Sequence, residues 1–137
     1  MAADDSRFAT SGINVGLFCS TPSVPVSRNL GRKQAMELLL TGHFIDAHTA
    51  LQWGLVNRVV PASRLNQEVA ELAGSIMSKS WVAVATGKRM FYKQLELPLE
   101  SAYDYASGVM AGNMMADDVE EGVDAFMQKR TPVWKHQ

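Results

Sequence analysis

The sequence predicts an α/β protein that is mostly helical, as at the helical end of a larger α/β fold. About six segments space their apolar residues as helices do, against about one clear strand, the β-branched run at residues 55–60 before Pro61. A lone strand leaves its backbone hydrogen-bonding groups without partners. A sheet is therefore expected elsewhere in a longer chain or in another subunit.

The first third of the chain is irregular in pattern. Residues 8–31 are rich in Gly, Ser, Thr and Pro, with Pro22 close to Pro25, which favours a strand, a loop and a short helix. The run Cys19-Ser20-Thr21 holds three potential nucleophiles, but no motif places an activating base beside them. We therefore interpret this run as a helix N-terminus that Ser or Thr caps.

Two short helices come next, and each has a glycine at its expected end. From Gly31 the apolar residues share one helix face, and Gly42 ends this helix as a residue suited to a left-handed cap. Asp46 is the expected N-cap of the following helix, which Gly54 ends. Residues 55–60 then form the predicted strand.

Four longer amphipathic helices are predicted after Pro61. Each has one stripe of apolar residues, spaced three or four apart, that would cover a core. The stripes are Leu65, Val69, Leu72, Ala73, Ile76 and Met77; Val84, Phe91 and Leu95; Leu99, Ala102, Tyr103, Ala106, Val109, Met110 and Met114; and Val119, Val123, Phe126 and Met127. Pro98 separates the second helix from the third, and Thr131-Pro132 is expected to end the last.

The composition excludes several classes of protein. The 137 residues carry 13 Lys and Arg against 14 Asp and Glu, so the basic excess of an electrostatic nucleic-acid binder is missing. No apolar run approaches the roughly 20 residues that span a bilayer. The acidic residues 1–5 do not resemble a signal peptide. One cysteine, Cys19, excludes an internal disulfide and suits a reducing compartment.

Candidate chemical groups are few. The chain has no phosphate-binding glycine loop and no metal-binding motif, and we interpret His43, His48 and His136 as ordinary polar or capping residues. The carboxylates at positions 117, 118, 120 and 121 suit acid–base or cation-binding work. They also fall at a predicted helix start, where the helix dipole favours negative charge, and we prefer that interpretation.

Lys129 and Arg130 are predicted in the last turn of the final helix, where cations complement the helix C-terminus. Phe126 precedes Lys129 by three positions and is expected to lie beside it. An aromatic ring next to a cation can also hold a nucleotide, by stacking and by pairing with phosphate. From the pattern alone, both the capping role and the nucleotide-binding role stay open.

Four segments resemble motifs of one family, in the family's order and spacing. They are FATSGINVG at 8–16, similar to F-A-x-P-E-[IVL]-x-[IVL]-G; GRKQAMELLLTG at 31–42, similar to G-x-x-x-A-x-x-x-x-L-T-G; residues 45–56, similar to I-x-A-x-x-A-x-x-x-G-L-V; and EGVDAFMQKR at 121–130, similar to E-G-x-x-A-F-x-x-K-R. This family is the crotonase superfamily of enoyl-CoA hydratases and isomerases. Residues 14–22 further resemble one subgroup of it.

The resemblance covers the C-terminal half of the family and implies the C-terminal, mostly helical portion of a crotonase-like spiral fold. Residues 1–60 are then the partial end of the spiral core, and residues 61–137 a helical region for oligomerisation and CoA contact. The family's other half carries most of the sheet, the oxyanion hole and one catalytic glutamate, so we expect this chain to be a fragment. Family members assemble as trimers or dimers of trimers, which implies a homo-oligomer.

The resemblance also implies a function in fatty-acid metabolism, on acyl-CoA thioesters. The family's second glutamate aligns with Gly12, which cannot exchange a proton. We therefore expect no catalytic residue here, and an inactive fragment. The aromatic and lysine that contact the CoA nucleotide in the family fall on Phe126 and Lys129, and a further aromatic falls on Met110. No metal is implied, and no cofactor apart from the coenzyme A of the substrate.

Two wider questions stay open at this point. A non-catalytic helical assembly or CoA-binding module is the alternative function, because the interface helices are intact while the sheet is missing. The implied compartment is a bacterial cytoplasm or, alternatively, the mitochondrial matrix.

Overall fold

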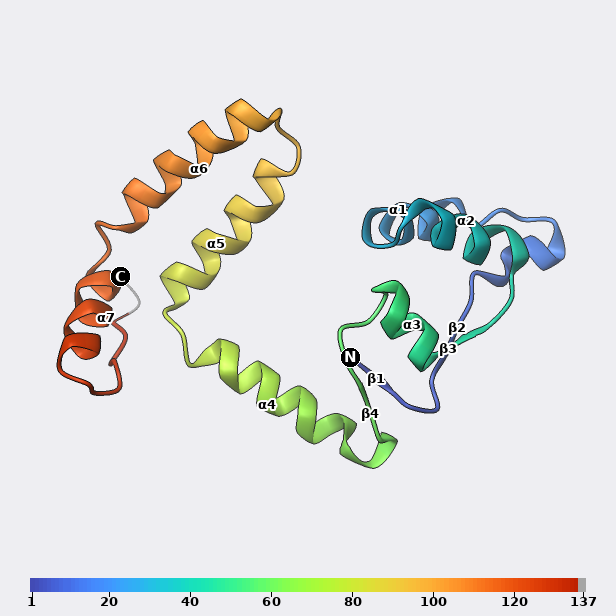
Figure 1. The fold of residues 1–137 in the computed structure, drawn as a ribbon, viewed down its shortest axis with the longest axis horizontal. Coiled ribbons are helices and arrows are strands. Elements are labelled where there is room, and N and C mark those ends of the chain that lie inside the picture. The colour runs from blue at the N-terminus through green and yellow to red at the C-terminus, as the bar shows by residue number, and fades with distance from the viewer. Residues whose placement is uncertain (136–137) are drawn as a thin grey trace. The chain divides into compact units, whose positions relative to one another are not determined.

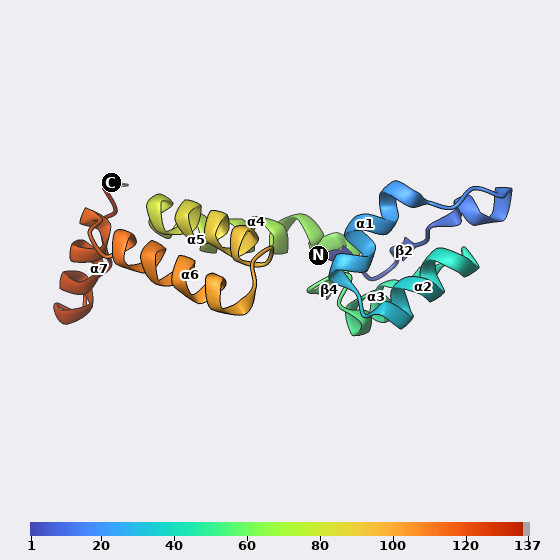
Figure 2. The same cartoon turned by 90° about the horizontal axis from the view of Figure 1, so that it is seen from above.

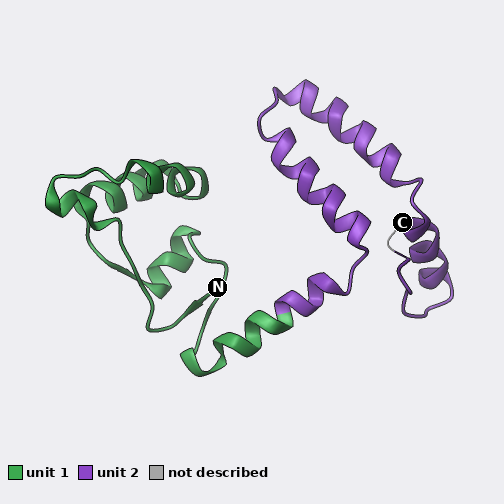
Figure 3. Cartoon of the chain, turned by 180° about the vertical axis from the view of Figure 1, so that it is seen from behind, with its two compact units in different colours: residues 1–71 green, residues 72–137 purple. Residues whose placement is uncertain are grey.

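The computed structural model describes residues 1–135, and His136 lies outside this part (Figure 1). The chain divides into two compact units, Met1–Glu71 and Leu72–Gln137 (Figure 3). The division falls within helix α4 (Leu65–Met77).

Four strands of two residues each lie in the first unit. β1 (Ala2–Ala3) pairs in parallel with β4 (Val59–Val60), and β2 (Arg7–Phe8) pairs in antiparallel with β3 (Ile45–Asp46). The prediction of one lone strand at residues 55–60 is therefore wrong. The strand covers only Val59–Val60, and β1 of the same chain is its partner. Two-residue strands are too short to show the alternating pattern by which sequence reveals a strand.

The first unit has three α-helices, of which the second and third have the capping residues that the sequence predicts. They are α1 (Ser20–Asn29), α2 (Arg32–Thr41) and α3 (Ala47–Trp53), with 3₁₀ helices η1 (Ser11–Val15) and η2 (Ala62–Arg64). Gly42 ends α2 as the predicted left-handed cap, with φ of 62°. Gly54 ends α3, as predicted, and is also left-handed, with φ of 85°. Asp46 Oδ1 accepts a hydrogen bond of 2.7 Å from the Thr49 N–H, which lowers the pKa of this carboxyl.

The core of the first unit lies where α1 and α2 run side by side (Figures 1 and 2). Leu30, Ala35 and Leu38 are buried there. The half-buried residues Val26, Ile45, Trp53 and Leu55 pack against them. The Thr10 hydroxyl, also buried, donates to the Leu38 carbonyl at 2.7 Å, which ties the segment before η1 to α2.

The second unit is helical in its described part. After the end of α4 come α5 (Trp81–Gln94), α6 (Leu99–Asn113) and α7 (Asp117–Met127), with α5 and α6 antiparallel and adjacent (Figures 1 and 2). All four predicted long helices are confirmed. Their apolar stripes, however, are largely uncovered: Tyr103 is 69% exposed and Met127 is 73% exposed.

None of the helices in residues 1–135 has the length and hydropathy that crossing a bilayer requires.

Candidate functional site

Helix α7 ends two residues earlier than Lys129, so the prediction that Lys129 and Arg130 occupy its last turn is wrong. Lys129 has a left-handed backbone with φ of 54°, and its N–H donates to the Phe126 carbonyl at 3.2 Å. The Arg130 N–H donates to the Ala125 carbonyl at 3.0 Å. These two bonds form a Schellman cap, which glycine usually occupies at the left-handed position.

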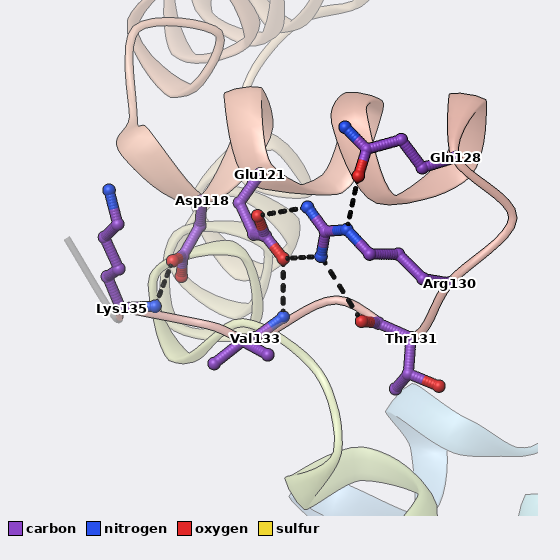
Figure 4. Close-up of polar contacts among 7 residues, drawn as sticks. All are labelled: Asp118, Glu121, Gln128, Arg130, Thr131, Val133 and Lys135. Atoms are coloured by element: carbon purple, nitrogen blue, oxygen red, sulfur yellow. Dashed lines mark hydrogen bonds and ion pairs between the residues drawn. The ribbon is translucent and has the colours of Figure 1, made fainter.

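A carboxylate in α7 holds the chain that follows this cap (Figure 4). The Arg130 guanidinium donates to both oxygens of Glu121, at 2.6 and 2.9 Å. The Val133 N–H donates to Glu121 Oε1 at 2.7 Å, and Arg130 Nε donates to Gln128 Oε1 at 2.8 Å. We call Glu121, Gln128, Arg130 and Val133 the Glu121 clamp. Two-point pairing of this kind fixes geometry as well as charge.

The clamp shifts the titration of both charged partners. Hydrogen bonds from Arg130 and then from the Val133 N–H lower the pKa of Glu121 from its ordinary value of 4.5 to about 2. The same pairing with Glu121 raises the pKa of Arg130. Protonation of Glu121 at low pH is therefore expected to weaken the hydrogen bonds of the Glu121 clamp.

We expect the clamp to stabilise the protein at neutral pH and to lose this contribution in acid. Because the folded pKa of Glu121 is lowered, the contribution is complete above about pH 4.5 and is lost as pH falls toward about 2. Thermal unfolding of the wild type and of Glu121→Gln between about pH 6 and pH 2 measures it. The two proteins should differ in stability at pH 6 and converge at the acid end. A difference that stays constant with pH would contradict this assignment.

The acidic residues at the start of α7 do more than complement the helix dipole. Asp117, Asp118 and Glu120 lie in the first turn, as predicted. Asp118, however, is buried and accepts from the Ser80 hydroxyl at 2.5 Å and from the Lys135 N–H at 2.7 Å. Its role is to tie the start of α5 and the C-terminal segment to α7. The sequence pattern carries no signal for these contacts.

The Trp134 indole strengthens the same attachment. Its Nε1–H donates to the Ser78 carbonyl at 2.7 Å, across 56 residues of sequence. A cavity of about 480 Å³ in the second unit lies beside this indole. Its lining is mostly apolar and includes Val84, Asn113 and Val119.

The two residues predicted to contact a nucleotide both lie at the exposed end of α7. Phe126 is 81% exposed, and Lys129 is also exposed. Within residues 1–135, the Lys129 ammonium takes part in no hydrogen bond or ion pair, whereas the neighbouring Arg130 is engaged by Glu121. The helical spacing that predicted Phe126 beside Lys129 is absent, because Lys129 lies beyond α7 in a left-handed conformation. An uncommitted ammonium and an uncovered ring at the same helix end can still bind the phosphate and the base of one anionic aromatic ligand. Met110, at the position of the further family aromatic, is exposed on α6.

Gly12 lies in η1, where an added side chain would force its neighbours to shift. A Cβ atom built on Gly12 would lie 2.7 Å from the Leu17 carbonyl oxygen and 2.7 Å from Cys19 Sγ. The Leu17 N–H donates to the Gly12 carbonyl at 3.0 Å, so residues 12–17 close on themselves. Position 12 therefore lacks a carboxylate, and a side chain there would require the Leu17 carbonyl to move.

The run Cys19-Ser20-Thr21 lies at the start of α1, as predicted, but the predicted capping is wrong. Cys19 is the N-cap, and no side chain caps the helix there. The Ser20 hydroxyl instead donates to the Phe18 carbonyl at 3.3 Å. Among the described residues, no group of three His, Cys, Asp or Glu side chains is arranged to hold a metal ion.

The described residues form short paired strands followed by amphipathic helices. The enoyl-CoA hydratase/isomerase family model matches residues 1–137. The chain therefore belongs to the enoyl-CoA hydratase/isomerase family, which confirms the resemblance in its motifs.

Individual relatives agree. The mitochondrial enoyl-CoA hydratase domain-containing protein 3 of Rattus norvegicus is 50% identical over 136 residues, 99% of this chain and 45% of its own length. It belongs to the subgroup that residues 14–22 resemble. This chain spans about half the length of such relatives.

Solved structures show the same fold. An enoyl-CoA hydratase of Mycobacterium smegmatis has a TM-score of 0.93 at 53% identity, with 96% of this chain and 51% of that chain covered. The human enoyl-CoA hydratase domain-containing protein 3 has a TM-score of 0.93 at 48% identity, with 96% and 52% covered. The predicted fold class is thus confirmed.

Proposed function

We propose that this chain is the CoA-contacting and assembly part of a family member that acts on acyl-CoA thioesters in fatty-acid metabolism. The observation that carries the proposal is the exposed end of α7, where the Phe126 ring is uncovered and the Lys129 ammonium is uncommitted. The ring stacks on the adenine of coenzyme A, and the ammonium pairs with one of its phosphates.

The backbone of Lys129 supports this assignment. A residue other than glycine in the left-handed region costs of order 1–3 kcal/mol, and such residues concentrate at functional sites. A purely structural cap would favour glycine, which adopts φ of 54° freely. A lysine at this position, in spite of the backbone cost, is expected where its side chain contacts a ligand.

Lys129→Gly is expected to separate binding from stability. The glycine relieves the backbone cost, so the melting temperature should hold or rise. Loss of the charge-assisted phosphate contact should weaken coenzyme A binding by about 1–2 kcal/mol, or about five- to thirty-fold. Isothermal titration with coenzyme A measures the affinity. Lys88→Ala, which removes an exposed lysine from α5, is the control and should bind as the wild type does. An unchanged affinity of Lys129→Gly would refute the contact.

We further propose that residues 1–137 do not hydrate enoyl-CoA by themselves. Hydration needs a carboxylate that orients water and exchanges a proton with the α-carbon. Gly12 has no side chain to supply it, and one added there would meet the Leu17 carbonyl. An assay with a short enoyl-CoA should show no turnover by this chain, and robust hydration would overturn the proposal.

The second candidate function is a non-catalytic helical assembly or CoA-binding module. In this proposal, residues 1–60 form the end of a spiral core. Residues 61–137 mediate assembly into a trimer and contact CoA. The uncovered apolar side chains of the second unit favour it, since exposed patches of this kind mark interaction surfaces. Size-exclusion chromatography with light scattering should show oligomers, and a well-folded monomer would count against it.

The compartment belongs to the same proposal. The name of the rat relative includes the word mitochondrial, which supports the mitochondrial matrix. A bacterial cytoplasm is the alternative compartment.

A further inference from the structure

We propose that Glu121 is a positioning residue for the ligand site at Lys129. Its carboxylate holds the turn after α7 in the conformation that presents the Lys129 ammonium. This inference rests on the proposed coenzyme A contact.

The contacts around Lys129 support a positioning role. The residues on either side of it, Gln128 and Arg130, are joined by a side-chain hydrogen bond of 2.8 Å. Glu121 then anchors Arg130 by two bonds and Val133 by a third. The chain is thus fixed before and after the left-handed residue, while the ammonium of that residue stays outside the network.

The clamp also determines which cation faces the ligand. Arg130 and Lys129 are adjacent, and either could pair with a phosphate. Because Glu121 engages the Arg130 guanidinium from both oxygens, Arg130 is neutralised within the chain. The phosphate is therefore left to Lys129, whose strained backbone would relax if the clamp opened.

A double-mutant cycle on coenzyme A affinity tests the role of Glu121. Glu121→Gln keeps the size of the side chain and removes its charge, and Lys129→Ala removes the ammonium. If Glu121 acts through Lys129, Glu121→Gln should weaken binding at least about threefold in the wild type and leave it unchanged in Lys129→Ala. Glu120→Gln is the matched control, because it removes the same charge from an exposed neighbour in α7.

A second variant keeps the test informative if Glu121→Gln folds poorly. Gln128→Ala removes only the hydrogen bond between the side chains of Gln128 and Arg130. It should weaken binding in the same direction, by less, and again without effect in Lys129→Ala. Circular dichroism establishes that each variant keeps its helices.

The outcomes distinguish failure of the positioning role of Glu121 from failure of the coenzyme A contact itself. If the wild type does not bind coenzyme A, or Lys129→Ala binds as tightly as the wild type, the contact itself is refuted and the role of Glu121 with it. If Lys129→Ala weakens binding but Glu121→Gln binds equally or more tightly, the positioning role alone is wrong. A loss of equal size in both backgrounds is the mark of a merely structural role and would also overturn it.

Discussion

Leu38→Ala is expected to lower the free energy of unfolding of the first unit by about 2–5 kcal/mol. Leu38 is 2% exposed and lies in the core with Leu30 and Ala35. Truncating a leucine to alanine loses its transfer free energy and leaves a cavity that the surroundings fill only in part. In a unit with few buried large side chains, this is a large share of the stability.

Hydrogen exchange localises the effect, because it reports the opening of single elements. Amides of α2 should exchange much faster in Leu38→Ala, whereas those of α5 and α6 should change little. Leu40→Ala is the matched control, since Leu40 is in the same helix but 52% exposed. Its effect should stay within about 0.5 kcal/mol. Equal losses from the two substitutions would show that the core described here is wrong.

Gly12→Ala is expected to destabilise the protein by about 1–3 kcal/mol, through overpacking. The added Cβ meets the Leu17 carbonyl and Cys19 Sγ, both at 2.7 Å. The thiol can rotate away, but the carbonyl belongs to the backbone, so residues 12–17 must shift. Chemical denaturation measures the loss.

The control for Gly12 is a glycine with room for a side chain. No atom lies within 4 Å of a Cβ built on Gly74, which is inside α4. Gly74→Ala should therefore stabilise by roughly 0.5–1 kcal/mol, the opposite sign. If Gly12→Ala is neutral or stabilising, position 12 has room for a side chain. Gly12→Glu would then restore the missing carboxylate without a shift of the backbone.

The sequence predicted the helices well because their signals are local. Apolar spacing predicted α4 to α7. The helix ends were predicted by capping residues that lie within one turn of the groups they cap, namely Asp46, Gly42 and Gly54. The prediction failed on the strands for the opposite reason. Ala2–Ala3 becomes a strand only through Val59–Val60, which lies more than 50 residues away and is not implied by any local pattern.

The candidate site divides in the same way. The motif at 121–130 drew attention to Phe126 and Lys129, and the structure places both at the exposed end of α7. The left-handed conformation of Lys129 was missed because lysine is uncommon there and only the two cap hydrogen bonds reveal it. The partners of Glu121 and Asp118 were missed because they come from segments that lack a local signal. These are the C-terminal segment, which folds back onto α7, and Ser80 at the start of α5.

The most direct test of the account is to follow the backbone amide resonances of the isotope-labelled chain during titration with coenzyme A. A ligand held by Phe126 and Lys129 should shift the amides of residues 126–133 most strongly, and Lys129→Gly should reduce these shifts. Shifts confined to the first unit, or saturable binding that leaves residues 126–133 unmoved, would contradict the central claim that the end of α7 contacts coenzyme A.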